Sequence, residues 1–247
     1  MRATATTRTT APTTAKLTAD PTAMGMPLAY SVRMGSLPFH STPRAPSGRE
    51  QTTAVLVLAA GASRRLGRPK ALVRLCGQSL LRRAAYQALA LHSAWVGVVV
   101  GSQAKALVGE LRGLPLEVIH APQWRLGLSA SLRVGVRAVP WHTKRFVVLS
   151  VDQWAITPAD LKRLLRARSR GPVGARYQHT IGIPALFPTR LRGALLGLSQ
   201  DGGAKRLLSI DHSVPMAHAA TDLDTPAALR TLRAQAHRHR RRLKPAP

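Results

Sequence analysis

Short apolar runs alternate with amphipathic stretches through most of the chain. Four runs are rich in valine and leucine, and their length is typical of strands buried on both faces. They are Ala54–Ala59, Trp95–Val100, Leu116–Ile119 and Phe146–Val151. The segments between them have helical periodicity: Ser79 is expected to cap a helix that runs to Leu91, and Ser102 one that ends near Leu111.

This alternation of strands and helices predicts one α/β domain. Because crossovers between parallel strands are right-handed, we expect a doubly wound, mostly parallel sheet with helices on both faces, a Rossmann-like arrangement. In a strand order of 3-2-1-4 the first and fourth strands are neighbours, and their carboxyl ends flank the crevice where such sheets bind ligands. Further strands are predicted at Pro172–Tyr177, Ile181–Phe187 and Val214–Ala219.

The composition divides the chain into three parts. Residues 1–51 are rich in threonine, alanine and proline, lack sustained periodicity, and are predicted to be a disordered low-complexity extension. Residues 52–237 are predicted to form the domain, and residues 238–247 a basic tail. Inside the domain, Thr157, Pro158 and Asp160 have the spacing of a helix start, which gives Asp160 a structural role.

The 247 residues include 37 basic and 10 acidic side chains, a formal net charge of +27. Because aromatic residues are only 4% and no zinc-finger spacing occurs, we interpret the charge as an arginine-rich solvated surface without specific nucleic-acid binding. No apolar run reaches the roughly 18 residues of a membrane helix. The single cysteine, Cys76, is expected to be a small buried hydrophobe, and a chain without intramolecular disulfides fits a soluble, cytoplasmic protein.

The candidate active site follows the first predicted strand, in the run AVLVLAAGASRRLGRPK from Ala54 to Lys70. Gly61 and Gly67 allow backbone conformations that are closed to other residues, so several N–H groups can converge on one anion. Arginines and Lys70 add positive charge, and this composition after a parallel strand predicts a polyphosphate site. We call Gly61–Lys70 the phosphate loop. It is no Walker loop, because no hydroxyl residue follows Lys70, and the fingerprint G-x-G-x-x-G is absent.

Two further segments carry candidate chemistry. Asp152 ends the run Phe146–Val151, so we expect it beside Gly61 at the switch point, as a ligand of Mg²⁺, which usually takes one or two carboxylates and substrate phosphates. The segment APQWRLGLSASLRVGV leads into a helix whose first turn holds Ser129 and Ser131. These serines either contact a nucleotide oxygen or simply cap the helix.

The phosphate loop and its strand resemble the signature L-A-A-G-x-S-x-R-x-G-x-P-K of the molybdenum cofactor cytidylyltransferases, in the MobA-like NTP transferase superfamily. The segment from Trp124 to Gly135 is similar to their nucleotide-contacting segment W-x-x-G-x-S-x-S-L-R-x-G, and D-L-D-T-P from Asp222 resembles their closing D-I-D-T-P. The fixed positions of the first signature are occupied by Leu58, Ala59, Ala60, Gly61, Ser63, Arg65, Gly67, Pro69 and Lys70.

The resemblance implies a nucleotidyltransferase that moves CMP from CTP to the phosphate of molybdopterin and releases pyrophosphate. It also implies catalytic roles for Arg65, Lys70 and Asp152, and Mg²⁺ held by Asp152 and Asp224, with Asp222 as the alternative to Asp224. A molybdoenzyme or its maturation chaperone is a candidate partner. The implied nucleotide-binding residues are Leu58, Ala59, Ala60, Gly61, Ser63, Arg65, Gly67, Lys70, Ser129 and Ser131, and the implied substrate-binding residues are Trp124, Gly182 and Pro184.

The chain departs from the family pattern at three positions. Trp154 replaces the proline of D-Q-P, Ile183 the histidine of G-H-P, and Lys205 the arginine of G-D-x-G-A-R. Two alternatives therefore stay open: a transferase that uses GTP or a different phosphorylated acceptor, and a non-catalytic relative that binds polyanions. Ala60 and Pro69 argue against GTP, because guanylyl relatives typically show L-A-G-G and D-K at these positions.

Overall fold

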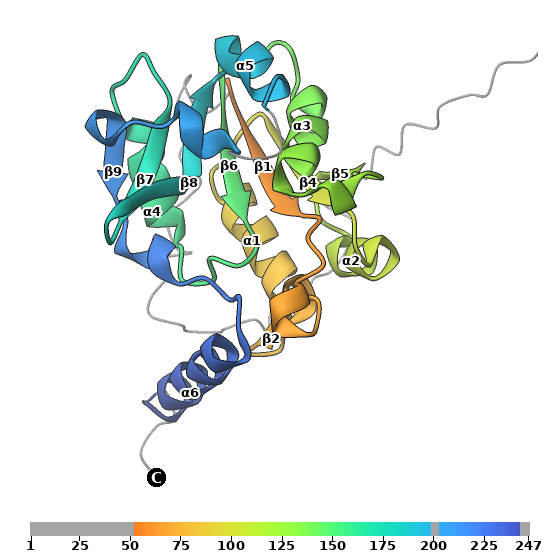
Figure 1. Cartoon of the computed structure of the whole chain (residues 1–247). Helices are drawn as coiled ribbons and strands as arrows, with labels where there is room; N and C mark the ends of the chain where they lie inside the picture. The colour runs from red at the N-terminus through yellow and green to blue at the C-terminus, as the bar shows by residue number, and fades with distance from the viewer. Residues whose placement is uncertain (1–51, 199–202, 243–247) are drawn as a thin grey trace, which may run out of the picture. The chain divides into compact units, whose positions relative to one another are not determined.

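The computed structural model describes residues 52–198 and 203–242. A seven-stranded sheet in the order β5-β4-β1-β6-β8-β7-β9 forms its centre (Figure 1). The strands are β1 Thr53–Ala59, β4 Trp95–Val100, β5 Glu117–His120, β6 Arg145–Ser150, β7 Val173–Tyr177, β8 Thr180–Pro188 and β9 Ser213–Pro215. A separate two-stranded hairpin pairs β2 Arg74–Leu75 with β3 Gln78–Ser79.

The parallel half of the sheet agrees with the predicted order 3-2-1-4. Strand β1 pairs in parallel with β4 on one side and β6 on the other, with Leu56 opposite both Gly97 and Val148. Every residue of β1 is buried, because its apolar side chains meet a helical layer on each face. The other half departs from the parallel pattern, since β8 runs antiparallel to β6 and to β7. The fold is therefore a mostly parallel, doubly wound sheet.

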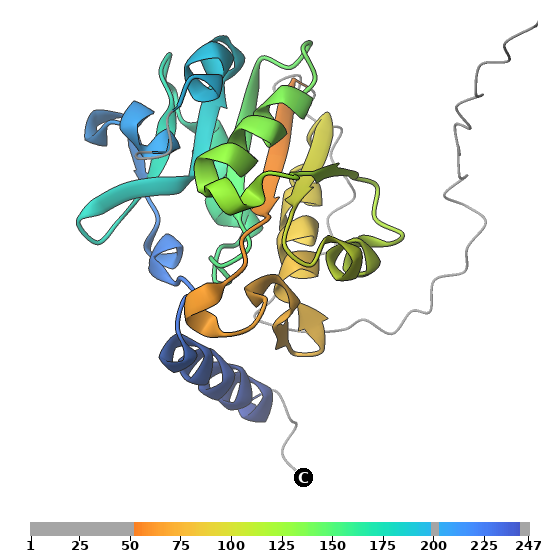
Figure 2. The ribbon, with the colours of Figure 1, turned by 45° about the vertical axis from the view of Figure 1, so that its right-hand side comes forward.

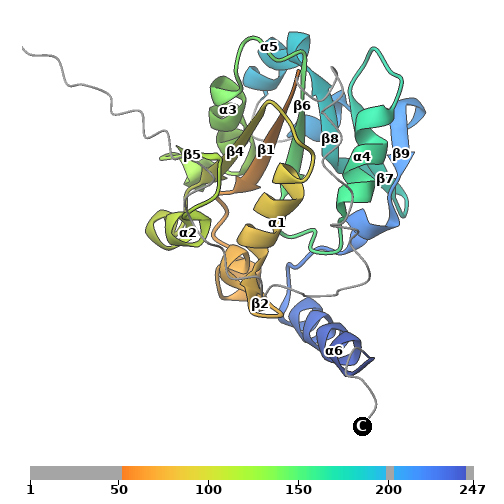
Figure 3. The same ribbon diagram turned by 180° about the vertical axis from the view of Figure 1, so that it is seen from behind.

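Helices cover both faces of the sheet. Side chains of α1 Leu80–Leu89, α2 Ala104–Leu111 and α4 Pro158–Arg166 share one core with Val55 and Val57, and Figure 3 shows these helices from behind. Those of α3 Leu128–Ala138 and α5 Arg192–Leu196 share the opposite core with Leu56 and Leu58. A Cβ at Gly135 would lie 2.6 Å from Leu56 Cδ2, so this glycine lets α3 pack closely on β1.

The chain after β9 ends in helix α6, Pro226–Arg242. Leu229 and Leu232 of α6 pack with Leu66, Val73 and Leu75, so the helix lies against the phosphate loop and the β2–β3 hairpin. Figure 2 shows α6 beside this part of the chain. The helix extends beyond residue 237, where the composition suggested the end of the domain. Residues 1–51 and 243–247 lie outside the described chain, so the division into three parts stays a prediction.

Two of the predicted helix starts are confirmed and one is wrong. Ser79 Oγ accepts from Arg82 N, and Thr157 and Asp160 form a reciprocal capping box at the start of α4. Helix α2 does not begin at Ser102. Its N-cap is Gln103, which has φ 59° and makes no side-chain cap, so here a left-handed backbone residue sets the helix start where the sequence suggested a hydroxyl.

Two other expectations were wrong. Cys76 is exposed, because it occupies the β2–β3 turn with φ 53° and is followed by Gly77 with φ 83°, a two-residue loop of the kind that hairpins favour. The strand expected at Val214–Ala219 is shorter. Strand β9 ends at Pro215, and a 3₁₀ turn follows at Ala217–Ala220. No helix in the described part of the chain is long and apolar enough to cross a membrane.

Candidate active site

The phosphate loop folds back on itself so that Lys70 returns to the end of β1. Ser63 has a left-handed backbone, φ 54° and ψ 42°, and its Oγ accepts a hydrogen bond from Lys70 N at 3.0 Å. Gly67, with φ 71°, closes the 3₁₀ turn Arg64–Leu66 by donating to Arg64 O at 3.2 Å. These contacts hold the loop from inside, and Leu66 anchors it to the hydrophobic cluster beneath α6.

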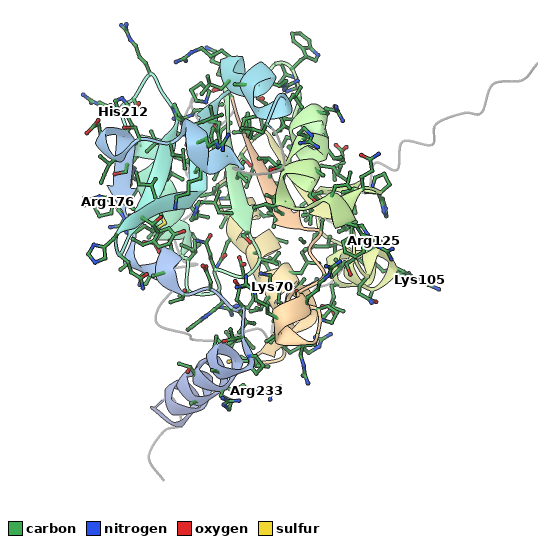
Figure 4. All side chains as sticks on the ribbon, in the orientation of Figure 1. Lys70, Lys105, Arg125, Arg176, His212 and Arg233 are labelled. Carbon is green, nitrogen blue, oxygen red and sulfur yellow. The ribbon has the colours of Figure 1, made fainter. Side chains whose placement is uncertain are left out.

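Lys70 joins two carboxylates from distant parts of the chain. Its Nζ lies 2.5 Å from Asp152 Oδ2 and 2.9 Å from Asp224 Oδ1. Asp152 follows β6, where Ser150 Oγ also donates to it, and Asp224 precedes α6. Arg65 Nη2 makes a second contact with Asp224 at 3.0 Å. Figure 4 labels Lys70 at this end of the central strands.

Electrostatics keep Lys70 and Asp224 charged. Burial lowers the pKa of Lys70, but the charges and hydrogen bonds of Asp152 and Asp224 outweigh it and raise that pKa overall. The hydrogen bond from Lys70, helped by the charges of Lys70 and Arg65, lowers the pKa of Asp224. Asp224 is thus a carboxylate at neutral pH.

Asp222 adds a third acidic side chain. A backbone bridge pairs Asp222 with Gln153, which places it next to Asp152. Burial, and then the charges of Asp152 and Asp224, raise the pKa of Asp222 to about 6. The sequence offered Asp222 as the alternative to Asp224, and the structure brings both to the site but gives the contact with Lys70 to Asp224.

A cavity of about 470 Å³, which we call the main cavity, opens at these residues. Its volume lies in the range of small-molecule sites. The phosphate loop forms one wall, the ends of β1 and β6 the floor, and the β7–β8 hairpin another part of the lining. Its polar and aromatic lining side chains are Arg64, Arg65, Lys70, Trp124, Arg125, Ser131, Ser150, Asp152, Gln153, Tyr177, Asp222 and Asp224.

Helix α3 begins at this cavity. Its N-cap is Gly127, which makes no side-chain cap, so neither Ser129 nor Ser131 caps the helix and that alternative is wrong. Both serines are buried in the first turn, but Ser131 alone of the two lines the cavity. Arg125 lies 5.3 Å from the centre of the Trp124 ring, and both residues line the cavity as well. The positive end of the α3 dipole thus adjoins the cavity.

Most of the implied site residues come together, and five do not. Those that line the main cavity are Leu58, Ala59, Ala60, Gly61, Arg65, Lys70, Trp124, Ser131, Asp152 and Asp224, while Ser63, Gly67, Ser129, Gly182 and Pro184 do not. Ser63 and Gly67 shape the loop from within. Gly182 lies under Tyr177, whose hydroxyl would be 2.7 Å from a Cβ there, and Pro184 is buried in β8 beside the lining residue Ile183.

Sequence reasoning assigned no role to several lining residues, among them Arg125, Gln153 and Tyr177. Gln153 is buried, and its Nε2 donates to Ile183 O at 2.7 Å and Ala219 O at 3.0 Å, while within the described chain its Oε1 has no partner. Gln153 follows Asp152 in D-Q-P, so that motif was the available signal. Tyr177 offered none, since only the pairing of β7 with β8 brings it to the cavity.

The three departures from the family pattern have different surroundings. Trp154 does not line the main cavity; it packs against the cluster around Leu66 and Leu223. Lys205 is exposed and donates to Thr180 Oγ1 at 2.6 Å. Ile183 is therefore the departure that changes the wall of the cavity.

The site can accept a divalent cation. Within residues 52–198 and 203–242 no group of three or more His, Cys, Asp or Glu side chains is arranged to hold a metal. Two carboxylates nevertheless converge on one point, where the Lys70 ammonium stands. Such a pair suits Mg²⁺, which usually completes its shell with substrate phosphates and water. Asp152 and Asp224 thus fit the implied metal.

The comparisons with known proteins agree with this arrangement. A family model, the MobA-like NTP transferase domain, matches residues 55–219, and the chain belongs to this family. Residues 55–219 thus form a domain of the nucleotidyltransferase class. The solved structure of the Mycobacterium tuberculosis rv0371c homolog from Mycobacterium sp. strain JC1 has a TM-score of 0.65 and 26% identity, over 76% of this chain and 98% of that one.

Two curated relatives are also similar. The bifunctional IPC transferase and DIPP synthase of Rubrobacter xylanophilus is 40% identical over 127 residues, which are 49% of this chain and 28% of that protein. The nicotine blue oxidoreductase of Paenarthrobacter nicotinovorans is 30% identical over 164 residues, 62% of this chain and 79% of that protein. The chain thus matches little more than a quarter of the first relative's length.

Proposed function

We propose that the protein transfers CMP from CTP to the terminal phosphate of molybdopterin and releases pyrophosphate. The observation that carries this proposal is that the phosphate loop, Asp152 and Asp224 meet at one cavity, with Lys70 in contact with both carboxylates. Cationic loop residues suit a triphosphate, and paired carboxylates suit the cation that accompanies it.

The reaction needs no nucleophile from the protein. An oxygen of the acceptor phosphate attacks the α-phosphorus of CTP, a new P–O bond forms there, and the bond to the β-phosphate oxygen breaks. Lys70 and Arg65 bind the departing pyrophosphate, whose charge grows as that bond breaks. Loop N–H groups add to this stabilisation. Asp152 and Asp224 would hold Mg²⁺, which would supply charge neutralisation and phosphate alignment.

Binding of the triphosphate requires Lys70 to exchange partners. In the structure its ammonium faces the two carboxylates rather than the loop. With phosphates bound, Lys70 would turn from the two carboxylates to phosphate oxygens, which would leave Asp152 and Asp224 to hold a divalent cation. The lysine thus keeps the two acidic side chains together until substrate arrives.

The choice of a pyrimidine is supported by the wall near Ala60. Ala60 is buried and lines the cavity. A Cβ added at Gly101 would lie 2.9 Å from Ala60 Cβ and 2.6 Å from Trp124 Cβ. Ala60, Gly101 and Trp124 are therefore in close contact. The Ala60 methyl fills space that glycine, which guanylyl relatives have there, would leave to a larger base.

The acceptor is assigned to the side of the cavity formed by Tyr177, Gln153, Ile183 and Asp222. Gln153 Oε1, which has no partner among the residues that the structure describes, can accept a hydrogen bond, and Asp222 can do the same when ionised. A pterin carries ring N–H and amino groups that are complementary to such acceptors. Ile183 adds an apolar surface for the flat ring.

The test is an assay of the purified protein with molybdopterin, Mg²⁺ and each of the four nucleoside triphosphates. We expect pyrophosphate and a dinucleotide product with CTP, at a kcat/KM at least tenfold above that with GTP. Preference for GTP would overturn the choice of nucleotide. Ala60→Gly should reduce the ratio of kcat/KM with CTP to kcat/KM with GTP. Ala106→Gly, on α2 outside the cavity, should leave that ratio unchanged.

A second candidate is a nucleotidyltransferase that acts on a different phosphorylated acceptor. Ile183, which replaces the family histidine in the cavity wall, favours it, as does the similarity to a protein named bifunctional IPC transferase and DIPP synthase. Mg²⁺-dependent binding of CTP, with no product from molybdopterin but release of pyrophosphate when another phosphorylated acceptor is supplied, would support this candidate. The name nicotine blue oxidoreductase of the other relative carries less weight, because this chain lacks the dinucleotide fingerprint G-x-G-x-x-G.

A further inference from the structure

A second cavity, of about 340 Å³, lies between the phosphate loop, the β2–β3 hairpin and α6. It shares no lining residue with the main cavity. Three arginines from three segments line it together with a mostly apolar surface. The lining residues are Gly67, Arg68, Pro69, Leu72, Val73, Arg74 and Arg233.

The packing of α6 creates this cavity. Leu229 and Leu232 hold the helix against Leu66 and Val73, which places Arg233 opposite the phosphate loop. Figure 4 labels Arg233 on α6, which Figures 1 and 2 show beside the loop. Helix α6 thus adds one cationic side chain to a cavity that the phosphate loop also lines.

The three arginines differ in how they are compensated. Arg74 donates to Gly77 O at 2.8 Å and forms an ion pair with Glu110 at 2.5 Å, so the carboxylate of Glu110 balances its charge. Arg68 and Arg233 make no hydrogen bond or ion pair with another residue of the described chain. Two exposed guanidinium groups, neither paired with a carboxylate of residues 52–198 or 203–242, thus line one cavity.

We propose that the second cavity binds a small organic phosphate and is coupled through the phosphate loop to the main cavity. Guanidinium groups bind phosphate oxygens through two parallel hydrogen bonds, which Arg68 and Arg233 are available to make. Pro69, Leu72 and Val73 offer an apolar surface to the organic part. An anion between the two arginines removes their mutual repulsion and fixes both side chains.

Coupling follows from the chain connectivity. Arg68 lies between Gly67, whose positive φ closes one 3₁₀ turn, and Pro69, which opens the turn that carries Lys70. Lys70 N is in turn bonded to Ser63 Oγ. A ligand that fixes Arg68 therefore restricts the segment that presents Lys70, and the coupling between the two sites is reciprocal.

Phenyl phosphate is the probe, titrated by calorimetry at low ionic strength into the full chain. We expect a binding event that weakens at least tenfold in Arg68→Gln/Arg233→Gln. The matched control is Arg206→Gln/Arg230→Gln, which removes the same charge from exposed positions that line neither cavity. Equal affinity in the two double variants would overturn the site, as would binding of phenol as tight as that of phenyl phosphate.

Coupling is measured as the affinity for CTP with and without phenyl phosphate. If phenyl phosphate competes with CTP in the main cavity, it weakens CTP binding equally in the wild type and in Arg68→Gln/Arg233→Gln. Any difference between the two proteins in the effect of phenyl phosphate on CTP affinity therefore comes from the second cavity. We expect a difference of at least threefold, and equal effects would overturn the coupling. If CTP does not bind at all, the proposed nucleotide is wrong, while the phenyl phosphate titration still decides whether the second site exists.

Discussion

Asp152 and Asp160 lie eight residues apart in sequence but have contrasting surroundings. Asp152 stands at the end of β6, in the wall of the main cavity, and its ion-pair partner is a lysine 82 positions away. Asp160 lies in the first turn of α4, buried, with contacts to Thr157, Arg163 and His218. The first carboxylate is held by a cation that can be exchanged, and the second is fully engaged by its neighbours. The contrast supports the proposal that Asp152 serves chemistry, whereas the contacts of Asp160 stabilise the start of α4.

The largest expected effect is that of Asp152→Ala on turnover. Loss of a carboxylate that holds the catalytic cation removes about 4 kcal/mol of transition-state stabilisation, so kcat should fall roughly a thousandfold. Folding should persist, because the residue lies at a strand end beside a cavity. Steady-state kinetics at saturating Mg²⁺, with circular dichroism and thermal melting, measure both. Near-normal turnover, or a loss explained by unfolding, would contradict the proposed metal site.

Lys70→Met tests whether the lysine and a metal use the same carboxylates. We expect kcat to fall about a hundredfold through loss of a cation at the pyrophosphate. Affinity for Mn²⁺ should instead rise, since Asp152 and Asp224 lose the ammonium that now occupies them. Paramagnetic resonance of free Mn²⁺ measures that affinity without substrates. Lys105→Met, on the exposed face of α2, is the control, and weaker Mn²⁺ binding in Lys70→Met would refute the exchange of partners.

Asp160→Ala should change stability and leave chemistry intact. It removes a capping box and the partner of Arg163 and His218, which we expect to cost about 2 kcal/mol of unfolding free energy. Urea denaturation measures this loss, and kcat at a temperature where the variant is folded should match the wild type. A drop in kcat comparable to that of Asp152→Ala would break the contrast between the two aspartates.

The smallest expected effect is on the pH dependence of stability. Burial opposes the charge of Asp160, but hydrogen bonds from His218, Thr157 and Arg163 outweigh it and lower its pKa below the usual 3.8. Ionised Asp160 therefore stabilises the fold above that value, and the contribution disappears as pH falls through the folded pKa. The stability difference between wild type and Asp160→Asn should be steady near pH 5 and shrink below pH 4 or so. His218→Asn repeats the comparison without the histidine, and a difference that grows in acid would be inconsistent with this sign.

Local sequence patterns predicted the parallel half of the sheet. Its strands have apolar centres, and the Thr157–Asp160 capping box has a sequence signature, so both were predicted at nearly the observed positions. The start of α2 was predicted wrongly because Gln103 adopts a left-handed backbone conformation, which the preferences of glutamine do not predict. Cys76 was misjudged because its exposure follows from the hairpin turn rather than from its side chain.

The site was predictable where motifs are contiguous and less so where the sheet assembles it. The phosphate loop and Asp152 follow strands whose neighbours could be deduced, so their meeting was expected. Tyr177 reaches the cavity through an antiparallel pairing that local patterns do not specify. The unpartnered Oε1 of Gln153 emerges only after its amide is matched to Ile183 and Ala219.

The contact between Lys70 and Asp224 also bears on the order of events during synthesis. The two residues are 154 positions apart, so the ribosome releases the phosphate loop long before it adds the second carboxylate. At roughly 5–20 residues per second, that interval lasts on the order of ten seconds. Until α6 docks on Leu66 and Val73, a nascent chain has a nucleotide loop but an incomplete acidic pair. Under the proposed function, activity requires Asp224 in place beside Lys70, so activity would report complete folding of the C-terminal part of the domain.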